Sequence, residues 1–159
     1  MVSVDSRTRF SSADPTLELD AFVAEHAGQL LDANGVAAGR AAAKGDLAPL
    51  TLDVDGELIT LVPNERILGL ERRADDALVV ALDRAGFSDL MQDAVSTFGL
   101  QLTGRAELRR GSVDDFVSWE PVLRCLLDGR RVHEAGSVTL QARDGSPLDV
   151  RRSFTVDDD

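Results

Sequence analysis

Residues 78–127 decide the fold of this chain, and they read LVVALDRAGFSDLMQDAVSTFGLQLTGRAELRRGSVDDFVSWEPVLRCLL. The apolar run at 77–82 is short and bounded by charged residues, which is typical of a buried strand. Asp83 can cap the helix that follows, and Gly99 fits its C-terminal cap. Between them, apolar side chains recur on one helical stripe: Phe87, Leu90, Met91, Ala94, Val95 and Phe98.

The second half of this stretch predicts a further strand and two short helices. Residues 100–109 look extended, and a glycine follows the segment. Ser112 and Asp115 have the spacing of a helix-capping box. Because proline is accepted in the first turn of a helix but breaks its interior, Pro121 should divide the remaining segment. The expected helices are 113–118 and 120–128, with Gly129 as the stop.

A β-hairpin precedes this stretch. Apolar and polar residues alternate on either side of Asp55-Gly56, a dipeptide that favours a two-residue turn. Such a turn pairs Leu52 with Ile59 and Leu50 with Leu61. Since directly paired residues share a face of the sheet, all four side chains should point to the same side.

The N-terminal part predicts helices. Residues 1–15 are polar and suit a flexible tail, and Thr16 can cap a helix with apolar residues at helical spacing. Asn34-Gly35 should interrupt this helix. An alanine-rich piece at 36–43 then predicts a second short helix, which ends at Gly45.

The sequence thus predicts both helices and strands. A third strand near 67–70 and a hairpin at 138–150 add to them. The expected organisation is a flexible tail at 1–15, a domain with extra N-terminal helices at 16–128, and a C-terminal hairpin or a join to a following domain at 129–159.

Charge and composition exclude several function classes. With 17 Lys+Arg against 28 Asp+Glu, the net charge of −11 repels phosphate backbones and anionic membrane surfaces. Aromatic residues make up 4%, which disfavours stacking platforms for nucleic acid. Since no apolar run approaches the ~18 residues of a membrane span, we expect no stable membrane insertion and a cytoplasmic location. Cys125 is the single cysteine, so it forms no internal disulfide.

No motif assigns catalytic chemistry to the chain. The sequence holds neither a phosphate-binding loop nor a dinucleotide fingerprint nor a nucleophile elbow. His26 falls in the apolar stripe of the first helix, which favours a structural role. His133 and Glu134 are sequence neighbours, which point away from each other in extended chain. We therefore predict no catalytic residue, no metal and no cofactor. A small enzyme that uses His133 and Glu134 is the remaining enzymatic alternative.

Three segments resemble the sterol-carrier-protein family. Residues 77–90 look like the strand that enters a helix in these domains, and 104–111 (GRAELRRG) are similar to their Gly-bounded strand. The hairpin at Asp55-Gly56 matches the family's opening strands. The resemblance covers about residues 48–128. It implies an α+β fold in which a curved, mostly antiparallel sheet is covered by helices around an apolar tunnel for acyl chains or sterols.

This resemblance implies a non-catalytic module that binds a hydrophobic small molecule: a fatty acyl chain, an acyl-CoA or a sterol-like lipid. Side chains from the two helical stripes would line or gate the pocket: Phe87, Leu90, Met91, Val95, Phe98, Trp119 and Leu123. The alternative is a protein-interaction or dimerisation domain, for instance a homodimer, in which the same side chains fill the core and no ligand enters.

The last segments carry a second resemblance. Residues 129–134 (GRRVHE) and 149–159 (DVRRSFTVDDD) look like the join that precedes a dioxygenase of the phytanoyl-CoA type. The resemblance implies an accessory domain that is covalently linked to an enzyme domain, with the catalytic residues beyond Asp159.

Overall fold

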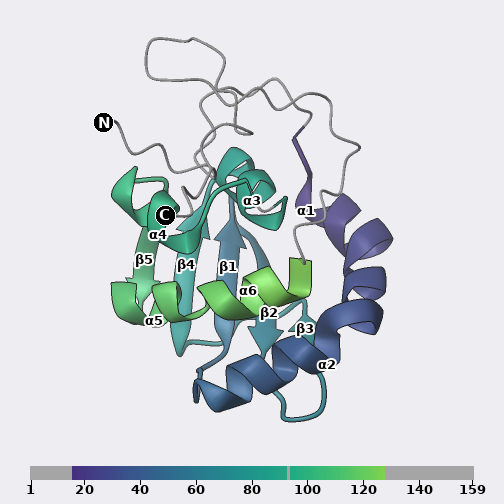
Figure 1. The fold of residues 1–159 in the computed structure, drawn as a ribbon. Coiled ribbons are helices and arrows are strands. Elements are labelled where there is room, and N and C mark those ends of the chain that lie inside the picture. The colour runs from purple at the N-terminus through teal and green to yellow at the C-terminus, as the bar shows by residue number, and fades with distance from the viewer. Residues whose placement is uncertain (1–15, 93, 128–159) are drawn as a thin grey trace, which may run out of the picture.

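The computed structural model describes residues 16–92 and 94–127, which form a sheet with helices packed on one face (Figure 1). The strand order is β3-β2-β1-β4-β5. The pair β1–β4 is parallel, and the other three pairs are antiparallel. The predicted α+β class with a mostly antiparallel sheet is confirmed. The strands are β1 (Leu50–Val54), β2 (Glu57–Val62), β3 (Gly69–Glu71), β4 (Leu78–Leu82) and β5 (Ala106–Arg110).

The helices lie across the front of the sheet and at one of its ends (Figure 1). In that view α2, α5 and α6 cross the sheet, while α3 and α4 lie near the ends of β4 and β5. Their bounds are α1 (Leu19–Ala21), the π-helix η1 (Phe22–Ala27), α2 (Gly28–Lys44), α3 (Arg84–Met91), α4 (Thr97–Leu102), α5 (Val113–Ser118) and α6 (Glu120–Leu127).

The predicted hairpin is confirmed in position and register. Leu52 pairs with Ile59 and Leu50 with Leu61, and all four side chains are buried. Asp55 and Gly56 both have positive φ, as a two-residue hairpin turn requires. The hairpin thereby directs one row of apolar side chains toward the helices, where the core forms.

The N-terminal helix is continuous, so the predicted interruption at Asn34-Gly35 is wrong. Asn34 Nδ2 donates a hydrogen bond of 2.9 Å to Leu126 O in α6, and Gly35 O accepts one of 2.9 Å from Leu68 N. These distant contacts favour the helix over the turn preference of the dipeptide. The helix starts after Glu18 instead of Thr16.

The predicted stripe after β4 divides into two helices. Asp83 caps α3 as predicted, because its carboxylate accepts a 2.6 Å hydrogen bond from Gly86 N. Ser96 then caps α4 by accepting a 2.9 Å hydrogen bond from Gly99 N. Gly99 therefore lies inside α4, and the prediction that it caps a longer helix is wrong. Because α4 is a separate helix, Phe98 does not continue the buried apolar stripe of α3. Its side chain is 52% exposed.

The segment around β5 agrees with the sequence in part. The predicted strand at 100–109 begins later, at Ala106, because its first residues belong to α4. The capping box of α5 is confirmed: Ser112 Oγ accepts from Asp115 N, and the Asp115 carboxylate accepts from Ser112 N. The Asp115 carboxylate also accepts a 2.7 Å hydrogen bond from Ser112 Oγ, and this bond, together with the one from Ser112 N, holds the pKa of Asp115 below its usual value. The helices α5 and α6 match the predicted pair.

Several predictions lie outside the described residues. They concern the tail at 1–15, the helix stop at Gly129, the hairpin at 138–150, the residues His133 and Glu134, and the dioxygenase-like join.

Candidate functional site

The predicted lining residues lie in the buried layer between the sheet and the helices, with one exception. Six of them are at most 5% exposed and belong to one apolar cluster: Phe87, Leu90, Met91, Val95, Trp119 and Leu123. Phe98 is on the surface of α4. The structure thus places the six side chains in the layer where the sequence expected a ligand, and these side chains occupy it.

Two contacts of aromatic side chains connect the elements around this apolar layer. The rings of Phe22 in η1 and Phe87 in α3 meet edge to face, with centroids 5.7 Å apart. Trp119 is fully buried, and its Nε1 donates a 3.1 Å hydrogen bond to Ala48 O, just before β1. The first contact ties α3 to the N-terminal helix, and the second ties the junction of α5 and α6 to the sheet.

Buried polar side chains border the layer around α3 and α4. Ser88 Oγ accepts hydrogen bonds from Leu17 N at 2.8 Å and from Gln92 Nε2 at 2.7 Å. In α4, both the N and the Oγ of Thr97 donate to Glu120 Oε2, at 2.7 and 3.0 Å. These polar groups form hydrogen bonds with one another and with the backbone. The apolar layer therefore ends where they begin.

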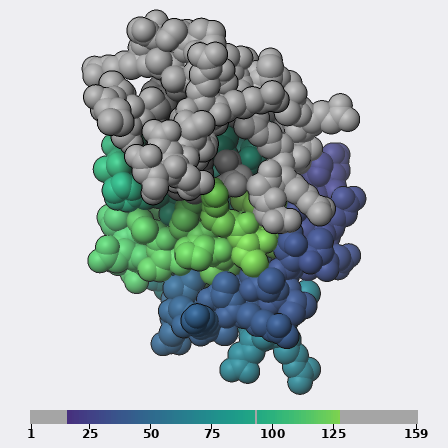
Figure 2. Space-filling model, viewed as in Figure 1, coloured from purple at the N-terminus to yellow at the C-terminus, as the bar shows by residue number. Residues whose placement is uncertain are grey.

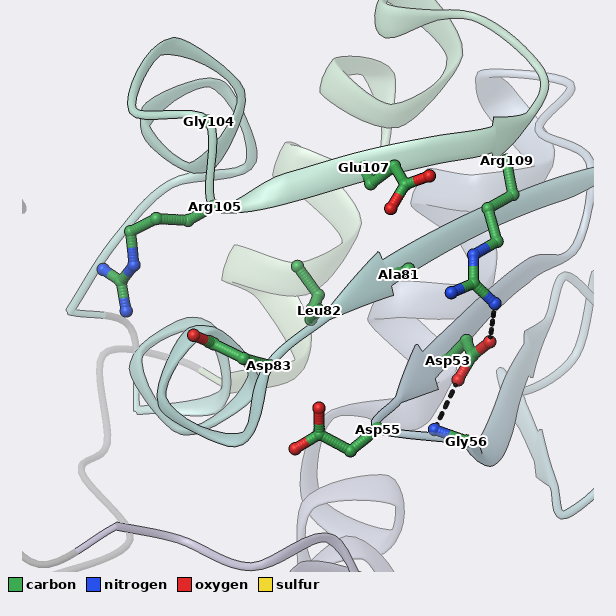
Figure 3. Close-up of a pocket in the computed structure, with 10 residues that line it drawn as sticks. All are labelled: Asp53, Asp55, Gly56, Ala81, Leu82, Asp83, Gly104, Arg105, Glu107 and Arg109. Atoms are coloured by element: carbon green, nitrogen blue, oxygen red, sulfur yellow. Dashed lines mark hydrogen bonds and ion pairs between the residues drawn. The ribbon is translucent and has the colours of Figure 1, made fainter.

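A second candidate site is a charged pocket of about 480 Å³ on the opposite face of the sheet (Figure 3). It lies where β1 and β4 end and β5 begins. The charged residues of its lining are four carboxylates and two arginines: Asp53, Asp55, Asp83, Glu107, Arg105 and Arg109. None of them is among the side chains that the sequence singled out for ligand binding.

Ion pairs engage both arginines of this pocket. The Asp53 side chain is 10% exposed, and it accepts hydrogen bonds from Arg109 Nη1 and, at 2.8 Å, from Gly56 N (Figure 3). Arg105 Nη2 donates to Asp89 Oδ2 in α3 at 2.8 Å. Asp55 Oδ2 lies 3.6 Å from Nε of Arg84, which is outside the lining, so Asp53 and Asp55 are both in ion pairs. The signal in the sequence was Asp53 itself, a carboxylate inside an otherwise apolar and threonine-containing strand.

Other classes of site find no support in the part of the chain that the structure describes. Within residues 16–92 and 94–127, no three His, Cys, Asp or Glu side chains are placed to hold a metal ion. His26 is partly exposed, with Nε2 3.8 Å from Glu25 Oε2. Cys125 is partly buried and packs against the core. None of the helices in these residues is long and apolar enough to span a membrane.

The space-filling view shows the helices on the front of the molecule (Figure 2). In that view the atoms of α5 and α6 lie directly above those of α2, and the two bands are in contact. Asn34 in α2 and Leu126 in α6 join them through the hydrogen bond described above. The apolar layer is therefore covered by helices along this contact.

The sheet order and its helical cover define a sterol-carrier-protein-like fold. The fold is similar to the solved structure of sterol carrier protein 2 from Yarrowia lipolytica in its apo form. That match has 17% identity and a TM-score of 0.51, and it covers 72% of this chain and 99% of that chain.

Two further solved structures are similar at lower TM-scores. The UbiJ-SCP2 ubiquinone synthesis protein matches with 18% identity and a TM-score of 0.48 over 62% of this chain and 90% of that chain. A conserved hypothetical protein from Thermus thermophilus, described as possibly a sterol carrier protein, matches with 15% identity and a TM-score of 0.48 over 77% and 91%. No protein-family model and no curated protein matches the sequence. At 17% identity the match to the Yarrowia lipolytica protein establishes the fold alone.

Proposed function

We propose that this domain is a non-catalytic module that binds a hydrophobic ligand between the sheet and the helices. The supporting observation is the sterol-carrier-protein-like fold, whose buried apolar layer contains six of the seven side chains that the sequence selected. The proposed ligands are a fatty acyl chain, an acyl-CoA or a sterol-like lipid. Service to an attached dioxygenase has only the sequence resemblance in its favour, so it stays a prediction.

The composition of the layer suits a flexible apolar ligand. Burial of each methylene group contributes ~0.8 kcal/mol, so a long chain gains a large free energy from a dry layer. Met91 and Leu90 lie side by side in sequence on the buried part of α3. Methionine adapts its shape to irregular neighbours. Since the layer is filled by its own side chains, a ligand must displace some of them.

Native mass spectrometry of the purified chain tests this proposal. The protein is mixed in turn with a long-chain fatty acid, its coenzyme A thioester and a sterol, and we expect a retained one-to-one adduct with at least one of them. Leu123→Trp adds bulk inside the layer and should remove the adduct. Leu102→Trp adds the same group at a side chain that is 71% exposed, so its adduct should persist.

The fold of each variant is checked by circular dichroism, because overpacking a core costs about 1–3 kcal/mol. If Leu123→Trp unfolds, Val95→Phe at the margin of the same layer replaces it. Absence of an adduct with all three ligands in the unmodified chain would contradict the proposal. An adduct that survives in a folded Leu123→Trp or Val95→Phe variant would place the ligand elsewhere.

A second candidate is a protein-interaction or dimerisation domain with a filled core. One observation favours it: Phe98 and Leu102 are both exposed and lie four residues apart, so they share a face of α4. This hypothesis predicts a dimer peak without ligand, which Leu102→Ser should convert to monomer. A monomer with a lipid adduct would reject it.

A further inference from the structure

We infer that strand β5 is a docking edge for a second copy of this chain, which pairs its own β5 antiparallel to the first. The inference goes beyond the proposed function, since this edge of the sheet lies outside the apolar layer and pairs with or without a ligand. It also differs from the second candidate function, which places only the face of α4 in an interface. It depends on the open edge of β5, on the order of its charges and on the apolar side chains beside it.

The strand β5 is the longer of the two edge strands of the sheet. It stands last in the strand order, and among the described residues its backbone ladder is formed with β4 alone. Every second residue of an edge strand directs its N–H and C=O away from the sheet, where a further strand can bind them. The opposite edge, β3, has three residues, whereas β5 has five and contains no proline. Charged side chains on an edge deter pairing unless the added strand complements them.

Two residues of opposite charge lie on the helix-free face of β5. Glu107 pairs with Ala81 of β4, and Arg110 pairs with Val79. Because Ala81 and Val79 are two residues apart in one strand, they and their partners share a face of the sheet. Glu107 and Arg110 are both exposed, and neither forms an ion pair with another described residue. One end of β5 therefore offers a free carboxylate and the other end a free guanidinium.

Antiparallel pairing of two β5 strands brings these unlike charges together. With Leu108 at the two-fold axis, Glu107 of each copy stands opposite Arg109 and next to Arg110 of the other copy. Arg109 is bound to Asp53, so Arg110 is the free cation for Glu107. A parallel pair in register would instead place each charge beside its own counterpart, which is unfavourable. Leu108 is half-buried against the core, and the two Leu108 side chains would cover each other at the axis. The order of charges thus selects an antiparallel second copy.

Exposed apolar side chains stand on the helices at both ends of β5. The helix α4 precedes the strand and α5 follows it, and they lie at its opposite ends (Figure 1). In the antiparallel pair, α4 of one copy therefore approaches α5 of the other. Of the five large apolar side chains that are exposed in the described residues, three belong to these two helices: Phe98, Leu102 and Val113. Their contact across the two copies would remove apolar surface from water and stabilise the pair.

Sedimentation equilibrium of the full chain tests the inference. We expect a dimer at ~100 µM, which exceeds the µM Kd of a weak interface. Glu107→Arg and Arg110→Glu each place like charges across the two-fold axis, so each should raise the dimer Kd at least tenfold. An equimolar mixture of these two variants restores an opposite pair at both contacts, and its Kd should return to within threefold of the unmodified value. The matched control is Glu65→Arg, which makes the same change of charge in an exposed loop outside β5 and should not weaken the dimer.

Restoration in the mixture separates strand pairing from a contact through α4 alone, because neither substitution lies in α4. Both substituted positions are exposed, and circular dichroism confirms the fold of each variant. A monomeric unmodified chain, a dimer whose Kd neither variant changes, or a mixture that stays monomeric would overturn the inference. Native mass spectra of the same samples keep the two proposals apart. A monomer with a lipid adduct refutes only the docking edge, and a dimer that takes up none of the three lipids refutes only the ligand-binding function.

Discussion

Replacing Gly39 by alanine should destabilise the domain, whereas the same change at Gly28 in the same helix should stabilise it. A Cβ at position 39 would lie 2.7 Å from Asn64 O and 2.8 Å from Leu68 N. Both are backbone atoms of the loop between β2 and β3, so the loop itself would have to move. A Cβ at position 28 meets nothing within 4 Å.

The two effects can be given magnitudes. Alanine is favoured over glycine in a helix by about 0.5–1 kcal/mol, which is the whole expected effect of Gly28→Ala. At Gly39 this gain opposes an overpacking cost of about 1–3 kcal/mol. Displacing the loop also weakens the 2.9 Å hydrogen bond from Leu68 N to Gly35 O, which contributes about 1 kcal/mol. The net expectation is a loss of about 1–3 kcal/mol, so the variants should differ by about 2–4 kcal/mol.

Urea unfolding measures this difference through tryptophan fluorescence. Trp119 is the single tryptophan of a chain without tyrosine, and it is fully buried, so its emission reports unfolding directly. In thermal unfolding the same difference corresponds to roughly 2–4 °C per kcal/mol for a chain of this size. If Gly39→Ala proves as stable as Gly28→Ala, the loop does not lie against α2, and the packing that makes this helix continuous is refuted.

Three further outcomes are expected. A double-mutant cycle of Phe22→Leu and Phe87→Leu should give a coupling energy of about 0.5–1.5 kcal/mol by urea unfolding; additive single effects would refute the edge-to-face contact. Because hydrogen bonds from Ser112 lower the pKa of Asp115 in the folded state, the stability from this carboxylate is present at neutral pH and is lost as the pH falls below about 4. Asp115→Asn should therefore show a shallower acid loss of stability than the unmodified chain. In hydrogen exchange, amides of α4 should exchange at least tenfold faster than those of β1, and equal protection would contradict this.

The elements that the sequence predicted correctly are those set by neighbours in the chain. The hairpin register follows from Asp55-Gly56, because only a few residue types accept positive φ at both turn positions. The capping box of Ser112 and Asp115 likewise needs groups only three residues apart. In both cases the deciding contact joins residues that are close in the sequence, so the local sequence pattern was sufficient to predict the element.

The wrongly predicted interruption of the N-terminal helix involves contacts with distant residues. Asn34 is a turn-forming residue, but its side chain donates to Leu126 O, 92 positions further along the chain. The residues next to Asn34 in the sequence do not reveal this hydrogen bond. The charged pocket was missed for the same reason: Asp53, Ala81 and Glu107 lie on three strands, and they become neighbours only once β4 pairs in parallel with β1.

The break between α3 and α4 makes α4 a separate short helix that can move without α3. Ser96 caps α4 independently of α3, so α4 can move without exposing unpaired amides of its neighbour. Phe98 and Leu102 are already exposed, and they lose little burial when the helix moves. In the described structure Gln101 Nε2 is buried without a hydrogen-bond partner, which raises the free energy of the closed state. Against these terms stand the burial of Leu100, which is 0% exposed in the core, and the contact of Thr97 with Glu120. A ligand that enters the apolar layer should therefore enter past α4.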